Sequence, residues 1–322
     1  MHQVRFEPAY VRLHRSGELT KRSQEASRLL ASCRLCPRRC GADRSAGAAG
    51  YCRGGASAAV ASHNAHHGEE PPISGSRGSG TVFFSGCNLR CAYCQNWPIS
   101  QQGQGREVSG DELAAMMLGL QRRGCHNINL VTPSHVVPQV LGAVDRAAAG
   151  GLGIPLVYNT SGYDSIDALR LLDGVVDIYL PDIRYRDRAA AARYSDAPDY
   201  PEVNAAALQE MWRQAGPLEV DDDGIARRGM IVRHLVLPGG LSQTRAALEF
   251  LAREISPDVH LSLMAQYFPA HRAIGIPELA RHLTADEYRQ ALDWLDEFGL
   301  EHGWHQELDG SGGGEHGAIV RW

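Results

Sequence analysis

The sequence predicts an α/β fold in which parallel strands alternate with helices. From residue 81 onward, an apolar run of strand length is followed six times by a stretch with helical periodicity. The strand segments are almost continuously apolar, as is typical of a parallel sheet whose two faces are both covered. Because six units are too few for a closed eight-stranded barrel, we expect either an open partial barrel or a doubly wound sheet.

The first three units carry clear boundary signals. The first strand ends at Gly86, and the helix after it has Asp111 and Glu112 in its first turn, where acidic side chains favour a helix start. The second helix ends in a pair of glycines. These strand and helix pairs are expected at 81–86 and 110–124, 127–133 and 135–151, and 155–161 and 164–174.

The last three units follow the same rhythm with one insertion. Residues 217–232 read as a hairpin, because an Asp-Gly pair at Asp223 and Gly224 favours a tight turn between strands. The fourth pair is expected at 175–184 with a long helical stretch that continues through 206–216. The last two pairs are expected at 229–240 and 242–255, and at 259–269 and 284–299.

The first 80 residues do not share this alternation. A helix is expected over 18–33, followed by a cysteine-rich stretch and a Gly/Pro-rich linker or loop at 68–80. We therefore divide the chain into an N-terminal helix and metal-binding arm with its linker, 1–80, and a core, 81–322. The core is expected to end in a short extension that contains the glycine-rich stretch 308–317.

Composition narrows the classes of protein. With 43% hydrophobic and 21% charged residues the chain is expected to form an ordinary globular core, and no apolar run is long enough to predict a membrane span. The N-terminus lacks an apolar leader, so a cytoplasmic location is expected. Lys21 is the single lysine, which excludes Schiff-base aldolases, pyridoxal enzymes and P-loop kinases from the main domain.

The charge is unevenly distributed. Residues 1–55 hold eleven Arg or Lys against four Asp or Glu, a net charge of +7. Because the whole chain has a net charge of −5, the remaining residues must carry −12. A basic segment can bind nucleic acid, but no aromatic-rich recognition motif accompanies this one, and we do not expect that partner. Arginines beside thiolates account for the same excess as local charge compensation.

Seven of the eight cysteines fall into two clusters, which favours metal over disulfides in a chain of this kind. Cys87, Cys91 and Cys94 form a C-x3-C-x2-C pattern directly after the first strand. Three thiolates leave one iron of a [4Fe–4S] cluster without a protein ligand, so that a substrate can bind there. Ligands bind at the carboxyl edge of parallel sheets, where this pattern lies.

The other cluster has the spacing C-x2-C-x3-C-x11-C. Four thiolates within twenty residues predict a second metal centre, with zinc and an iron–sulfur cluster both open, and a disulfide pair as a further alternative. Its members are Cys33, Cys36, Cys40 and Cys52. Cys125 stands apart and is expected to be a small buried residue.

The stretch "SGSRGSGTVFFSGCNLRCAYCQNWPIS" resembles the radical S-adenosylmethionine (SAM) superfamily, whose signature is C-x3-C-x2-C after the first barrel strand. Together with "CRLCPRRC", "NLVTPSHV", "YNTSGYD", "YLPDIRY", "RHLVLPGG" and "MAQYFP", it looks like the branch of pyruvate formate-lyase-activating-enzyme-like iron–sulfur proteins. The likeness runs from about Cys33 to about Phe268. It implies a partial (β/α)6 TIM-like barrel with a [4Fe–4S] cluster at its top, held by Cys87, Cys91 and Cys94.

The resemblance also implies residues that bind SAM. Tyr93 is assigned near adenine, Asp182 and Arg233 match cofactor contacts of relatives, and Asn159 ends the third strand with a side chain that can bond a carboxylate or ribose. The Gly-Gly-Glu motif that holds the methionyl amine in many relatives is absent. "VTPSH" stands in its place, and the candidates for the contact with the methionyl amine are Thr132, Ser134 and His135. Of these we assign Ser134.

The function implied is reductive cleavage of SAM to a 5′-deoxyadenosyl radical that abstracts hydrogen from a protein or peptide, as in activators of glycyl-radical enzymes. An external one-electron reductant of flavodoxin or ferredoxin type is expected. The alternatives are radical modification of a peptide natural product or RNA, and, outside enzymes, an iron–sulfur electron-transfer protein. An electron carrier would use a closed four-cysteine site, which argues against that alternative.

Overall fold

The computed structural model describes residues 6–307 and 319–321. Its centre is one eleven-stranded sheet in the order β11-β10-β9-β8-β6-β5-β4-β2-β1-β3, with β7 paired to β8 beside this path. The parallel part consists of β2 (Ser79–Phe84), β4 (Ile128–Val131), β5 (Leu156–Thr160), β6 (Ile178–Pro181), β8 (Ala226–Leu235), β9 (His260–Met264) and β10 (Gly303–Gln306).

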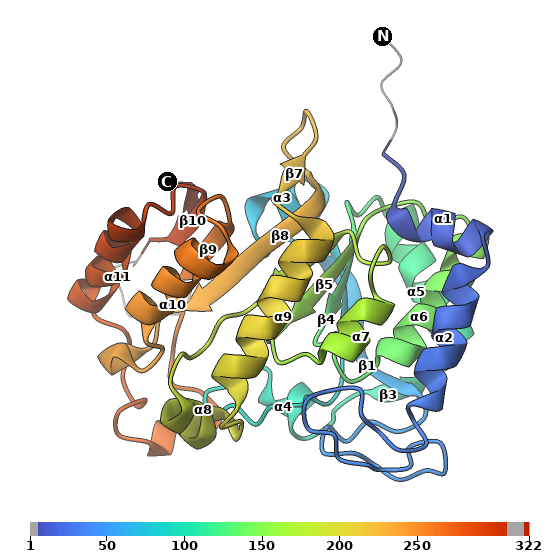
Figure 1. Cartoon of the computed structure of the whole chain (residues 1–322), viewed down its shortest axis with the longest axis horizontal. Coiled ribbons are helices and arrows are strands. Elements are labelled where there is room, and N and C mark those ends of the chain that lie inside the picture. The colour runs from blue at the N-terminus through green and yellow to red at the C-terminus, as the bar shows by residue number, and fades with distance from the viewer. Residues whose placement is uncertain (1–5, 308–318, 322) are drawn as a thin grey trace.

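Helices join the parallel strands and pack against the sheet (Figure 1). The six predicted strand-helix units are confirmed, and β10 adds a parallel strand that was not predicted. The sheet ends in β3 and β11 and does not close, which agrees with the predicted partial barrel. The helices of the six units are α5 (Gly110–Arg122), α6 (Val137–Ala149), α7 (Ile166–Leu171), α9 (Tyr200–Ala215), α10 (Thr244–Phe250), which η2 (Leu251–Ile255) extends, and α11 (Ala285–Phe298).

The N-terminal residues are more closely joined to the sheet than the sequence indicated. β1 (Ala58–His66) pairs antiparallel with both β2 and β3 (Arg106–Val108), and its run of small and polar residues gave no strand signal. Helices α1 (Ala9–Arg15) and α2 (Glu18–Arg28) contact α6. The predicted boundary at residue 80 therefore lies beyond a strand of the main sheet, and the division into two domains stays a prediction.

The interior of the open barrel is apolar at one end. The short helix α3 (Pro71–Ser74) lies at the amino ends of the parallel strands, opposite the end that carries α4 (Trp97–Ser100) and α8 (Arg188–Ser195) (Figure 1). Ile73 of α3 is fully buried and packs with Val157, Ile178, Leu180 and Ile231 from the strands. This helix therefore closes the barrel interior at the amino ends of the strands.

The remaining elements are short. The predicted hairpin is confirmed: β7 (Glu219–Val220) pairs antiparallel with β8 across a turn in which Gly224 has a φ of 75°. The other pieces are η1 (Pro238–Gly240), η3 (His271–Gly275) and β11 (Ile319–Arg321). The expected glycine-rich extension at 308–317 lies outside the described residues. In the part of the chain that is described, no helix is long and apolar enough to cross a membrane.

Candidate functional site

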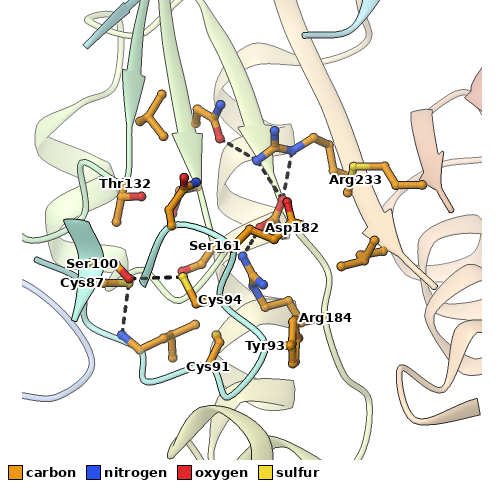
Figure 2. A pocket seen from close by; sticks show the side chains of 18 of the residues that line it. Cys87, Cys91, Tyr93, Cys94, Ser100, Thr132, Ser161, Asp182, Arg184 and Arg233 are labelled. Carbon is orange, nitrogen blue, oxygen red and sulfur yellow. Dashed lines mark hydrogen bonds and ion pairs between the residues drawn. The ribbon is translucent and has the colours of Figure 1, made fainter. Parts of the chain in front are cut away.

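A cavity of about 230 Å³ opens at the carboxyl ends of the parallel strands. Cys87, Cys91 and Cys94 line one side of it, and Asp182 and Arg233 line the other (Figure 2). The sequence separates these two groups by about ninety residues or more, and the sheet brings them together, because strands that run parallel end at the same edge.

The loop that carries the three cysteines is fixed by backbone hydrogen bonds. The amides of Arg90 and Ala92 donate to the carbonyls of Ser195 and Tyr194, at 3.1 and 2.7 Å, so the end of α8 supports the loop from behind. Gly86 precedes Cys87 with a φ of 86°, and a Cβ atom there would lie 2.2 Å from the carbonyl oxygen of Cys52. A residue with a side chain cannot occupy that position without moving the loop.

Each of the three thiols has a polar neighbour. The Leu89 amide donates to Cys87 Sγ at 3.4 Å, Ser195 Oγ donates to Cys91 Sγ at 3.0 Å, and Ser100 Oγ lies 3.2 Å from Cys94 Sγ. Burial raises the pKa of the Cys87 thiol to about 12, with Cys91 and Cys94 adding to the effect. Thiols of this kind lose their protons only when a cation compensates the thiolate charge.

This arrangement fits an iron–sulfur cluster. Within the described residues no three His, Cys, Asp or Glu side chains are grouped to hold a metal ion. A cluster of four irons is much wider than one ion, so its thiolate ligands lie correspondingly farther apart around a cavity. Three thiols lining one cavity, each beside a hydrogen-bond donor of the kind that tunes cluster sulfurs, meet that requirement.

The opposite side of the cavity carries two arginines around one carboxylate. Arg233 Nε donates to Asp182 Oδ1 at 3.0 Å, and Arg184 donates to Asp182 Oδ2 at 2.5 Å. Burial alone would lower the pKa of both guanidinium groups, but Asp182 keeps them above their usual value. Both guanidinium groups line the cavity, and their planar sets of N–H donors suit an anionic group of a ligand.

Two further groups hold Arg233 in place. Its guanidinium donates to Asn159 Oδ1 at 2.6 Å and lies 3.5 Å from Glu69 Oε2. Glu69 enters from the turn between β1 and α3, and its side chain is 9% exposed. Burial raises the pKa of Glu69 to about 7, although Arg233 acts in the opposite direction. Glu69 was not predicted, because nothing in "HHGEEPP" places it inside the barrel.

Tyr93 lies in the cavity wall between the cysteines and is buried. Its hydroxyl accepts a 2.7 Å hydrogen bond from Tyr185, and its ring meets those of Tyr185 and Tyr267 edge to face, with centroids 6.4 and 6.0 Å apart. These contacts fix the ring, so that Tyr93 presents a rigid aromatic surface to a ligand.

Of the three candidates in "VTPSH", only Thr132 lines the cavity. It has a φ of 60°, a conformation that β-branched residues rarely adopt and that is concentrated at functional sites. Ser134 is buried, and its hydroxyl bonds Thr160 Oγ1 at 3.1 Å. His135 is bonded to the Ser85 carbonyl instead. The structure thus does not bring our assigned Ser134 to the cavity surface.

Besides Glu69, two residues of the site went unassigned in the sequence. Arg184 stands two positions after Asp182 in "YLPDIRY", and the motif itself was the available signal. Ser195 is bonded to Cys91 across 104 positions, a contact that no local pattern reveals.

The second group, Cys33, Cys36, Cys40 and Cys52, does not line the cavity. All eight cysteines are free thiols, so the disulfide alternative is not supported. Cys33, Cys36 and Cys52 are buried, and Cys40 is exposed.

Comparison with known proteins agrees with this geometry. Residues 81–187 match the family model of the Radical SAM superfamily. An uncharacterized protein of Methanocaldococcus jannaschii is 28% identical over 283 residues, which cover 86% of this chain and 78% of that protein. A radical SAM methyltransferase from Sphaerobacter thermophilus is similar over 71% of this chain and 67% of its own, with a TM-score of 0.45 and 15% identity, too distant to bear on the chemistry.

Proposed function

We propose that this radical SAM enzyme binds SAM in the cavity between Cys87, Cys91 and Cys94 and the Asp182–Arg233 pair, and abstracts hydrogen from a protein or peptide. Membership of the superfamily rests on the matched model and implies a [4Fe–4S] cluster and SAM. The observation that supports this placement is the juxtaposition of three thiols and two arginines across one cavity. The branch of glycyl-radical-enzyme activators stays a prediction, because the matched model describes the whole superfamily.

The thiolates of Cys87, Cys91 and Cys94 would hold the cluster and leave one iron open. When bound, the cluster supplies one electron to the sulfonium of SAM, which splits into methionine and a 5′-deoxyadenosyl radical that takes a hydrogen atom from the substrate. An external one-electron reductant would supply the electron for each cleavage.

The remaining residues would bind and orient SAM. Arg233 and Arg184 offer guanidinium donors to the methionyl carboxylate, and Asp182 holds both in position. The ring of Tyr93 would lie against adenine. Asn159 already accepts a hydrogen bond from Arg233, so its predicted contact with SAM would use its amide group.

We assign Thr132 in place of Ser134 as the residue nearest the methionyl amine. Its hydroxyl lines the cavity, and its strained backbone is held by a 2.8 Å bond from its amide to the Asn159 carbonyl. A backbone held in this conformation keeps the hydroxyl at one position of the cavity wall.

A macromolecular substrate is supported by the resemblance to activating enzymes and by the surface beside the cavity. Phe268 and Ile274 are 42% and 68% exposed, and both belong to the segment that follows β9. That segment contacts the cysteine loop, since the Ala273 amide donates to the Ala92 carbonyl at 3.0 Å. Exposed apolar side chains beside a site are typical of surfaces that receive a partner.

The conditions of the reaction follow from the same chemistry. Eight free thiols are consistent with a reducing compartment such as the cytoplasm. A flavodoxin or ferredoxin type of protein would supply single electrons. The electron-transfer alternative is not carried further, because the radical SAM match indicates an enzyme.

The test of SAM cleavage is anaerobic reconstitution of the full chain with iron and sulfide, followed by dithionite and SAM. We expect the parent and a Cys125→Ala control to release 5′-deoxyadenosine, and each of Cys87→Ala, Cys91→Ala and Cys94→Ala to release none. Cys125 is a suitable control because it is also buried but lies outside both clusters. Undiminished cleavage in any of the three variants would overturn the assignment.

The substrate class is tested by deuterium transfer. The reconstituted enzyme is incubated with SAM and either the protein or the RNA fraction of cells grown on deuterated precursors. We expect deuterated 5′-deoxyadenosine with the protein fraction alone. Transfer from the RNA fraction instead would favour the alternative of RNA modification.

A further inference from the structure

A buried cation lies beside the four-cysteine loop. Arg44 is fully buried, and its Nη1 atom lies 3.8 Å from Cys33 Sγ. A Cβ atom on Gly54 would lie 2.6 Å from Arg44 Nη2 and 3.2 Å from Cys52 Sγ, which places that nitrogen and that sulfur on the same side of the turn. The Arg44 guanidinium therefore lies beside the sulfurs of Cys33 and Cys52, on the buried side of the loop.

The charge of Arg44 lacks a visible counter-ion. Its Nε and Nη1 donate to the carbonyls of Gly55 and His135, at 3.0 and 2.7 Å, whereas Nη2 is buried without a hydrogen-bond partner. Among the ion pairs of the described residues, none involves Arg44. Arginine stays protonated in proteins, and a buried charge without an opposite charge costs several kcal/mol.

The thiols themselves are the groups beside Arg44 that can become anions. The Cys33 and Cys40 thiols contact each other, and a Cβ on Gly50 would lie 3.2 Å from Cys40 Sγ and 3.6 Å from Cys52 Sγ. The loop is closed by backbone bonds between Cys33 and both Ala42 and Gly41, at 3.0 and 3.1 Å. The sulfurs of Cys33, Cys40 and Cys52 thus lie near one another beside the guanidinium, and Cys36 belongs to the same loop.

We propose that Cys33, Cys36, Cys40 and Cys52 bind a second metal centre as four thiolates, with Arg44 as its buried counter-cation. A [4Fe–4S] cluster and a zinc ion would each leave about two negative charges on a four-thiolate site. The wider cluster fits the geometry better, because within the described residues no three His, Cys, Asp or Glu side chains are grouped to hold a single metal ion. The thiolates then supply the counter-charge for Arg44, and its Nη2 atom lies on the same side of the turn as the Cys52 sulfur. The proposal is independent of SAM cleavage, since none of these residues lines the cavity.

The position of this centre links it to the cysteine loop of the cavity. The Cys52 carbonyl lies against Gly86, and Arg38 Nε donates to the Asn88 carbonyl at 2.8 Å. Arg90 donates to the carbonyls of both Tyr51 and Cys87. Folding of the four-cysteine loop around its metal therefore sets one wall of the loop that carries Cys87.

The experiment uses a full-length Cys87→Ala/Cys91→Ala/Cys94→Ala variant, so that metal at the cavity does not interfere. After anaerobic purification and reconstitution, elemental analysis is expected to find one zinc, or four irons with sulfide, per chain, and Mössbauer and absorption spectra separate the two. Adding Cys36→Ser and Cys40→Ser should remove that metal. A triple variant that holds neither metal would overturn the proposal.

The role of Arg44 is tested by competition with a chelator in the same background. We expect Arg44→Met to bind the metal with an affinity 10- to 100-fold lower than that of the parent, the usual effect of removing a group that supports metal ligands. Arg44→Lys, which keeps the charge, should retain more metal than Arg44→Met. The control is Arg34→Met, because Arg34 lies in the same loop but is exposed. Equal retention by Arg44→Met and the control would refute the role of Arg44.

Discussion

Removing the charge of Asp182 is expected to destabilise the folded chain by about 3 kcal/mol. Asp182 accepts from Arg233 at 3.0 Å and from Arg184 at 2.5 Å, and the Asp182 and Arg233 side chains are only 11% and 17% exposed. Loss of one partner from a buried ion pair costs roughly 3–5 kcal/mol, because a charge is left unpaired in the protein. Residual exposure, together with Glu69 at 3.5 Å from Arg233, places the expected value at the lower end.

A double-mutant cycle isolates the interaction itself. Asp182→Ala, Arg233→Ala and the double variant are unfolded with urea under anaerobic conditions. Once either partner is gone, losing the other should cost less, so we expect a coupling energy of about 2 kcal/mol. Arg188 and Glu202 provide a control pair of an arginine and a carboxylate, 2.8 Å apart but 66% and 52% exposed, for which less than about 1 kcal/mol is expected.

The comparison between the two pairs decides the outcome. A coupling between Asp182 and Arg233 no larger than that between Arg188 and Glu202 would refute the reasoning from burial. The same variants should also bind SAM more weakly, because the guanidinium groups lose their fixed positions. Equal SAM affinity with a large coupling energy would assign the pair to stability alone.

Three other perturbations test separate parts of the site. Ser195→Ala should make the reduction potential of the reconstituted cluster more negative, since Cys91 loses a 3.0 Å donor; an unchanged potential in redox titrations followed by EPR would contradict this. The raised pKa of Glu69, about 7, means that its stabilising effect is lost as pH rises from about 4.5 through 7. The free energy of unfolding of the parent should therefore fall by roughly 1–3 kcal/mol relative to Glu69→Gln between pH 5 and 8, and parallel profiles would count against it. Gly86→Ala should cost more stability than Gly224→Ala and lower iron incorporation, because both glycines have positive φ but only Gly86 faces an atom, the Cys52 oxygen at 2.2 Å.

The parts of the fold that sequence predicted are those in which the signal is local. Strands such as β5 and β6 are buried along their whole length and therefore read as continuous apolar runs. β1 was missed because its exposed edge positions carry Ser62, Asn64 and other polar or small residues. α8 was merged into a longer helical stretch, since the break at Asp196, with a φ of 54°, uses a residue type that also occurs within helices.

The site divides in the same way. Cys87, Cys91 and Cys94 are recognisable because one loop holds all three. The sequence offers no basis for separating Ser134 from Thr132, because the side chain that reaches the cavity depends on the backbone torsion at one residue, which composition does not report. Ser195 depends on tertiary contact with a loop far away in sequence.

The alternation along the strands links the site to the fold. Val157, Leu180 and Ile231 face the barrel interior near α3, and the residues two positions later on the same face are Asn159, Asp182 and Arg233. Along each of these strands, the side chains that face the barrel interior therefore change from apolar to polar or charged over two residues. A slip of one residue in the pairing of β6 with β8 would turn Asp182 or Arg233 toward the helices and separate the two charges. The residues that we assign to SAM binding consequently also select the register of the sheet that places them.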